Sequence, residues 1–113
     1  MSDVVSFGGD IDCKARAATL ETIFDQLARC APDHAEFREL LAQREIFDAI
    51  GGWFFDALSP DALDLLMRIV DEMNVDLPAV AARANWVEDR RPIFYADVAR
   101  FRAALADRIA RLD

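Results

Sequence analysis

Glycine and proline are scarce in this chain, with four of each among 113 residues. Since these residues bend or end regular structure, their scarcity argues against long irregular connections. No stretch of the sequence approaches the roughly 20 apolar residues that a membrane-spanning helix needs. Histidine occurs once, as His34, so the paired Glu-x-x-His sets of a di-metal helical bundle are excluded.

Cysteine is also rare, with only Cys13 and Cys30. The two positions are 17 residues apart in one expected helix, and the helical rise separates them by roughly 25 Å, far beyond disulfide reach. No Cys-x-x-Cys pair or neighbouring histidine offers a zinc site. Both cysteines are therefore expected to be small, partly buried hydrophobic residues, and no metal or cofactor is expected.

Hydrophobic residues make up 54% of the chain, enough for one modest core, so residues 1–113 are expected to form a single domain. Residues 1–11 are expected to be an extended or flexible N-terminal segment. They lack the basic start and apolar run of a signal peptide, which favours a cytoplasmic location. The formal net charge of −8 disfavours phosphate backbones and anionic membranes and favours basic partners.

Apolar residues recur at three- and four-residue steps, which is typical of amphipathic helices. The pattern predicts an all-α fold, a single compact bundle of about five helices over 14–30, 34–50, 60–73, 77–90 and 94–112. Asp33 and Glu36 resemble a capping box, and Ser59 before Pro60 is a strong start signal. The expected core is Leu20, Phe24, Leu27, Phe37, Leu41, Phe47, Leu63, Leu66, Val70, Val80, Val98, Phe101, Leu105 and Ile109.

The stretch Met73–Asp76 resembles the turn of a helix-turn-helix, with Asn74 in the left-handed position that this family usually fills with glycine. Val80 matches the buried aliphatic residue of the second helix. The resemblance implies a DNA-binding regulator that places residues 77–90 in the major groove. Val70 and Arg83 depart from the pattern, and the second helix has few side chains able to contact bases. We therefore favour a plain helical hairpin.

Arginine is concentrated in the C-terminal part of the chain. Residues 83–113 hold seven arginines and five acids, whereas residues 1–82 hold 16 acids and six bases. One interpretation is that these arginines pair with acidic helices of the same molecule. The alternative is a binding face for carboxylate or phosphate groups. Its residues would be Arg83, Arg90, Arg91, Arg100 and Arg102.

Three consecutive aromatic residues, Trp53, Phe54 and Phe55, follow two glycines. They cannot all face one side of a helix, so they are expected either to close the end of the bundle or to anchor a partner. Trp86 lies beside the apolar stripe of its helix and raises the same alternatives. With Tyr95 nearby, it is expected to leave apolar surface for a homodimer or another protein.

No catalytic motif is present. His34 has charged neighbours, which favours a solvated side chain, and Ser59 already has a capping role. The sequence therefore predicts a non-catalytic, cytoplasmic protein-protein interaction module that binds neither nucleic acid nor membrane. A helix-turn-helix regulator is one alternative. An acidic inhibitor of a nucleic-acid-binding protein is another.

Overall fold

Five α-helices make up most of residues 17–43 and 54–112, the parts of the chain that the computed structural model describes. Residues 17–30 form the first, and they are followed by α2 (Ala35–Ala42), α4 (Pro60–Val75), α5 (Leu77–Arg83) and α6 (Arg91–Ala110). Two short 3-10 helices, η1 (Phe55–Ala57) and η2 (Glu88–Arg90), precede α4 and α6. These ranges contain no strand, and the predicted all-α fold is confirmed.

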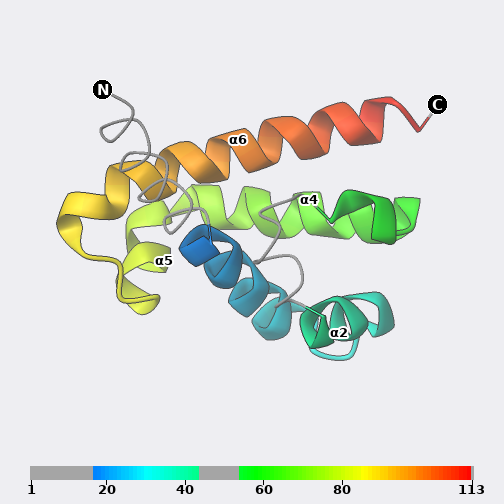
Figure 1. The fold of residues 1–113 in the computed structure, drawn as a ribbon, viewed down its shortest axis with the longest axis horizontal. Helices are drawn as coiled ribbons and strands as arrows, with labels where there is room; N and C mark the ends of the chain where they lie inside the picture. Colours follow the sequence, from blue (N-terminus) through cyan, green and yellow to red (C-terminus); the bar gives the residue numbers. More distant parts are fainter. Residues whose placement is uncertain (1–16, 44–53, 113) are drawn as a thin grey trace, which may run out of the picture.

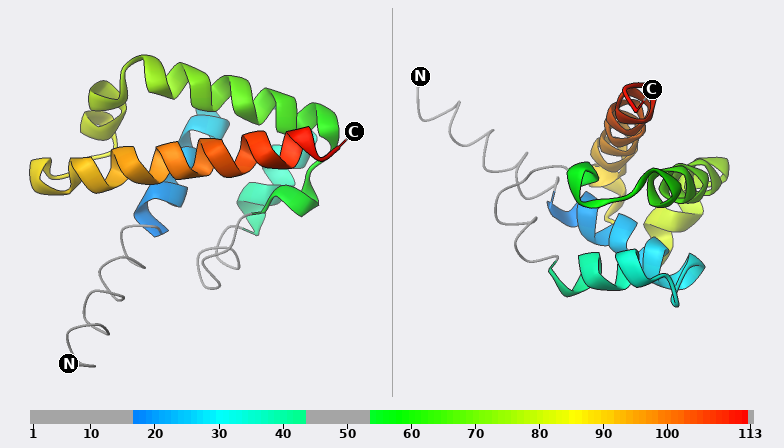
Figure 2. Two further views of the ribbon diagram at one scale, coloured as in Figure 1. Left: turned by 90° about the horizontal axis from the view of Figure 1, so that it is seen from above. Right: turned by 90° about the vertical axis from the view of Figure 1, so that its right-hand side faces the viewer.

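The two longest helices, α4 and α6, lie side by side and run in opposite directions (Figure 1). The helix over 17–30 crosses one face of this pair, as the left view of Figure 2 shows. The opposite side of α6 is not covered by any described segment in that view. Helix α5 lies at the end of the bundle where α4 ends and α6 begins.

The N-terminal ends of α2 and α4 are capped differently. Ser59 caps α4 as predicted, because its hydroxyl oxygen accepts from the Ala62 N–H at 3.2 Å. The predicted capping box of α2 is wrong. His34 is the N-cap there, accepting from the Phe37 N–H at 3.4 Å and stacking on the Phe37 ring. Glu36 instead turns toward Ser59.

The boundary between α4 and α5 differs from the predicted turn. Asn74 is helical, and α4 continues to Val75. One residue, Asp76, separates the helices, and its carboxylate caps α5 by accepting from the Ala79 N–H at 3.3 Å. The expectation that Asn74 takes the left-handed position is therefore wrong. The Asp76 side chain caps α5 directly after α4, and no residue between the two helices takes the left-handed conformation.

The left-handed position is at Asn85, with φ 64°. Its N–H donates to the Ala82 carbonyl at 3.2 Å, and the Trp86 N–H donates to the Ala81 carbonyl at 2.9 Å. This is the Schellman arrangement, in which asparagine can replace glycine. It ends α5 at Arg83, seven residues before the predicted end. Helix α6 then begins at Arg91, three residues before its predicted start.

The core agrees closely with the prediction. Of the expected core residues, Leu41 and Ile109 are half-buried rather than buried, and Phe47 lies outside the described residues. The remaining expected residues are buried. The structure adds several large side chains that the prediction omitted: Ile23, Phe54, Phe55, Leu40, Ile69, Met73, Trp86 and Phe94.

Two further expectations concern the surface. Cys30 is exposed and free, so the prediction of a partly buried side chain is wrong there, while Cys13 and residues 1–11 lie outside the described residues. Among the described helices, none is long and apolar enough to cross a membrane.

Candidate interaction surface

The aromatic patch is part of the core where the structure describes it. Phe54 is 2% exposed and Phe55 is 6% exposed. Their rings contact Phe101 of α6 at centroid distances of 5.9 and 5.2 Å, and Phe54 also packs on Phe24. The interpretation that these two residues close the bundle fits this placement, and neither offers surface to a partner. Trp53 lies outside the described residues.

Trp86 is buried as well, so the expectation that it leaves apolar surface is wrong. Its ring stacks on Phe94 at 4.9 Å, and its indole N–H donates to the Thr22 hydroxyl at 3.0 Å. The Schellman turn at Asn85 directs the chain back over the core, which accounts for this burial. Tyr95 is half-buried next to Phe94.

Side-chain hydrogen bonds at Thr19, Thr22 and Gln26 join helix 17–30 to the C-terminal half of the chain. Thr19 donates to the buried Asp97 of α6 at 3.0 Å, Thr22 accepts from Trp86, and Gln26 accepts from Arg83 of α5 at 3.3 Å. The three donors and acceptors on this helix recur at three- and four-residue steps beside its apolar stripe. None of the three was predicted from the sequence, although the spacing of polar residues beside an apolar stripe could have indicated that they contact a neighbouring helix.

The five candidate arginines do not form one face. Arg102 binds Asp71 of α4 at 2.7 Å, which fits the intramolecular interpretation, and Arg100 lies 3.8 Å from Asp97 of its own helix. The Nε of Arg91 donates to the Trp86 carbonyl at 3.2 Å. Arg83 is bound to Gln26. The side chain of Arg90 is exposed, and no hydrogen bond or ion pair joins it to another described residue.

An open hollow of about 420 Å³ lies between helix 17–30 and the loop that connects α5 to α6. Glu21 and Asp25 lie on its helical wall, and Arg90 lies on the other side. Its apolar lining includes Val87, which is 66% exposed. The remaining lining residues are Ala18, Thr22, Ala84, Asn85 and Trp86. This groove combines accessible apolar surface with charges of both signs.

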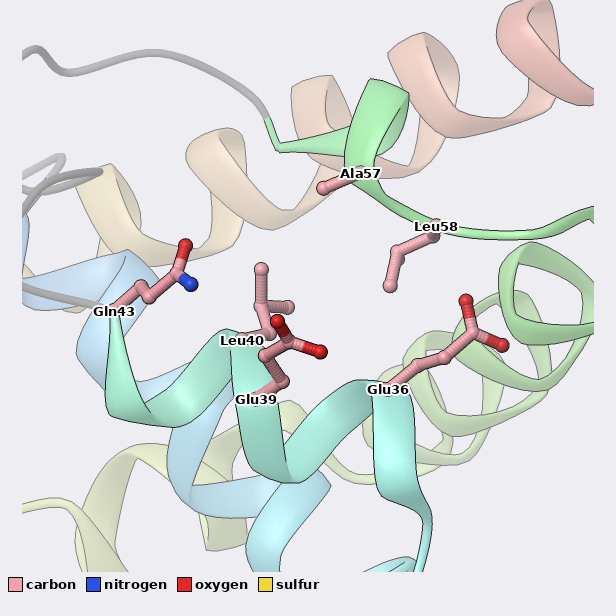
Figure 3. A pocket seen from close by; sticks show the side chains of 6 residues that line it. All are labelled: Glu36, Glu39, Leu40, Gln43, Ala57 and Leu58. Carbon is pink, nitrogen blue, oxygen red and sulfur yellow. The ribbon is translucent and has the colours of Figure 1, made fainter.

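A smaller hollow of about 120 Å³ lies beside α2, lined by Glu36, Glu39, Leu40, Gln43, Ala57 and Leu58 (Figure 3). Both oxygens of Glu36 are used, because Oε1 accepts from the Ser59 N–H at 2.8 Å and Oε2 accepts from its hydroxyl at 2.6 Å. These two hydrogen bonds lower the pKa of Glu36. The hollow is therefore the edge of a structural contact between α2 and α4.

The surface of α5 offers little for reading DNA. Its exposed side chains are Pro78, Ala79, Ala82 and Arg83, and Asp76 places a carboxylate at its N-terminus. Adenine and guanine are usually read by amide or guanidinium groups that reach into the groove. Among the exposed side chains of α5, Arg83 is the one that carries an amide or guanidinium group, and it already binds Gln26.

Among the described residues, no group of three or more histidine, cysteine, aspartate or glutamate side chains is arranged to hold a metal ion. The chain matches no protein-family model, no curated protein and no solved structure. The candidate site is the groove between helix 17–30 and Val87, where an apolar hollow lies beside the exposed Asp25 and Arg90.

Proposed function

We propose that this chain is a cytoplasmic, non-catalytic protein-interaction module. Its partner contributes an apolar side chain to the groove between helix 17–30 and the α5–α6 loop. A basic residue of that partner faces the exposed Asp25. The observation that carries this proposal is the hollow of about 420 Å³ beside the exposed Val87.

Three properties support a protein segment as the occupant. The walls are apolar at Ala18, Ala84 and Val87, and apolar contact surrounded by polar groups is typical of protein interfaces. Asp25 is exposed and has no ion pair with another described residue. The groove is built on the side of helix 17–30 and on the turn after α5, both of which the core holds in place, so little ordering is needed on binding.

Charge supports a basic partner. The formal net charge is −8, and α4 adds exposed acids at Asp61, Asp64, Asp71 and Glu72. Such a surface speeds encounter with positively charged proteins. The same argument favours the acidic-inhibitor hypothesis, in which the basic site of the partner normally holds nucleic acid. Under that hypothesis, the protein that occupies the groove is a nucleic-acid-binding protein.

The proposal is tested with a photo-crosslinking residue at position 87, and with the same residue at position 75 as the matched control. Val75 is 86% exposed but lies at the end of α4, outside the groove. A specific adduct at position 87 that is absent at position 75, and is lost on Asp25→Arg, supports the proposal. Equal adducts at both positions, or none at either, overturn it.

A further inference from the structure

Helix α6 carries two apolar stripes on different sides. One consists of Phe94, Val98, Phe101 and Leu105, all buried in the core. The other consists of five alanines, all exposed: Ala96, Ala99, Ala103, Ala106 and Ala110. A surface helix usually presents charged and polar residues opposite its core face. The second stripe leaves α6 with an apolar side that the described part of the molecule does not cover.

The alanines follow one another at steps of three, four, three and four residues. This is the spacing of the seam in a two-helix coiled coil, where every such residue faces the partner helix. Small side chains at these positions let two helix axes approach closely. The spacing of the alanines does not identify the partner helix. The charged residues beside the alanine seam favour a second copy of α6.

Arg100 and Asp107 lie on the same side of the seam, seven residues apart. If a second copy of α6 packs antiparallel, with Ala103 opposite Ala106 of the other copy, then Arg100 faces Asp107 of that copy. The two-fold axis repeats the contact, so two opposite-charge pairs form and no like charges meet on this side. The charge pattern is thus complementary to itself.

Both side chains are available for such pairs. The side chain of Arg100 is 66% exposed, and its contact with Asp97 is long at 3.8 Å. The side chain of Asp107 is 61% exposed, and its carboxylate pairs with Arg111 one turn away. A parallel arrangement would instead set Arg102 against Asp107 of the other copy, but Arg102 is bound to Asp71 at 2.7 Å. The antiparallel arrangement breaks no contact between helices.

The position of α6 in the fold permits this packing. It runs along one edge of the molecule in Figure 1, and its outer side faces the viewer unobstructed in the left view of Figure 2. Its 20 residues span about 30 Å. A contact of that length between alanine stripes is small, so the association is expected to be weak and dependent on concentration.

We propose that the exposed alanine face of α6 is the interface of a homodimer in which the two α6 helices pack antiparallel. The pairs between Arg100 and Asp107 across the two-fold axis set that orientation. This inference does not depend on the proposed groove, which lies on a different surface built from helix 17–30 and the α5–α6 loop.

Sedimentation equilibrium of the full chain over a wide concentration range tests the dimer. The wild type is expected to associate reversibly. Arg100→Glu and Asp107→Arg each create two like-charge contacts, so each is expected to raise the dimer Kd by at least about tenfold. A mixture of the two variants restores both opposite-charge pairs, so a heterodimer should form with a Kd within about threefold of the wild type.

Two more variants separate the interface from the fold. Arg38→Glu changes a charge on α2, away from α6, and should leave association unchanged. Ala103→Glu places a charge in the seam and should abolish the dimer while circular dichroism and thermal midpoint stay unchanged, since Ala103 is exposed. A wild type that remains monomeric at the highest concentration overturns the proposal. So does a dimer that the Arg100 and Asp107 reversals and their mixture do not affect.

Discussion

Glu36 accepts two hydrogen bonds from Ser59, one from its N–H and one from its hydroxyl. The residues are 23 positions apart, so the pair joins α2 to the N-terminus of α4. The same hydroxyl oxygen accepts from the Ala62 N–H and caps α4. Ser59 therefore stabilises its own helix and holds a second helix against it.

Replacing Ser59 tests this double role. Ser59→Ala removes the cap and one donor to Glu36, and is expected to lower the free energy of unfolding by about 1–2 kcal/mol. Ser59→Thr keeps the hydroxyl and should lose much less. Urea unfolding followed by circular dichroism measures both. Equal stability of the alanine and threonine variants would show that the hydroxyl contributes nothing.

The Glu36 contact also predicts a dependence of stability on pH. Hydrogen bonds from Ser59 lower the pKa of Glu36 in the folded state below its ordinary value of 4.5. The ionised carboxylate therefore stabilises the fold above pH 4.5, and this contribution is lost as the pH falls through the lowered pKa. The stability difference between wild type and Glu36→Gln should narrow as the pH falls through this range. Glu39→Gln, on the same helix but exposed, is the matched control. A difference that stays constant with pH contradicts the assignment.

Phe101 is fully buried and contacts Phe54 and Phe55. Phe101→Ala should therefore cost about 3–5 kcal/mol, because the cavity cannot close completely. Ile109→Ala, at a half-buried position of the same helix, should cost clearly less. Thermal unfolding compares the two variants. Similar midpoints for Phe101→Ala and wild type would show that α6 is not packed against the aromatic cluster.

The contact between Trp86 and Thr22 predicts a fluorescence signature. In a Trp53→Phe background, emission comes from Trp86 alone and should be blue-shifted, because its ring is buried. Thr22→Val removes the acceptor of the indole N–H and should destabilise the protein by about 1–3 kcal/mol. Thr22→Ser retains the hydroxyl and serves as the control. Red-shifted emission of Trp86 in the native state would contradict its burial.

The hairpin interpretation of α4 and α5 predicts no binding of duplex DNA at near-physiological salt. The net charge is −8, and affinity for DNA depends largely on neutralising phosphates. Fluorescence anisotropy with labelled duplexes at several salt concentrations measures this. Salt-sensitive binding that is lost on Arg83→Ala would instead favour the helix-turn-helix regulator.

The sequence alone was enough to predict an all-α fold of about five helices and most of the core. Periodic apolar residues and local stop or start signals act over a few positions, so Ser59 and Pro60 could be read directly as the start of α4. The stripe on α6 was likewise visible, since Val98, Phe101 and Leu105 recur on one face of any helix.

Helix boundaries near asparagine required the tertiary structure. Asn74 and Asn85 have the same intrinsic tolerance for positive φ, and only Asn85 uses it, because Trp86 gains burial against Phe94 when the chain turns there. The sequence could not rank the two positions. The burial of Trp86 that favours Asn85 depends on contact with Phe94, which forms only when the chain folds.

The choice between core and surface was also decided by tertiary packing. Local sequence left Phe54, Phe55 and Trp86 able to anchor a partner or close the bundle, and long-range contacts placed them inside. For the same reason, Glu36 accepts hydrogen bonds from Ser59 and does not cap the N-terminus of its own helix. Local patterns determine which residues are apolar or able to cap, whereas contacts between distant segments determine which of those capacities is used.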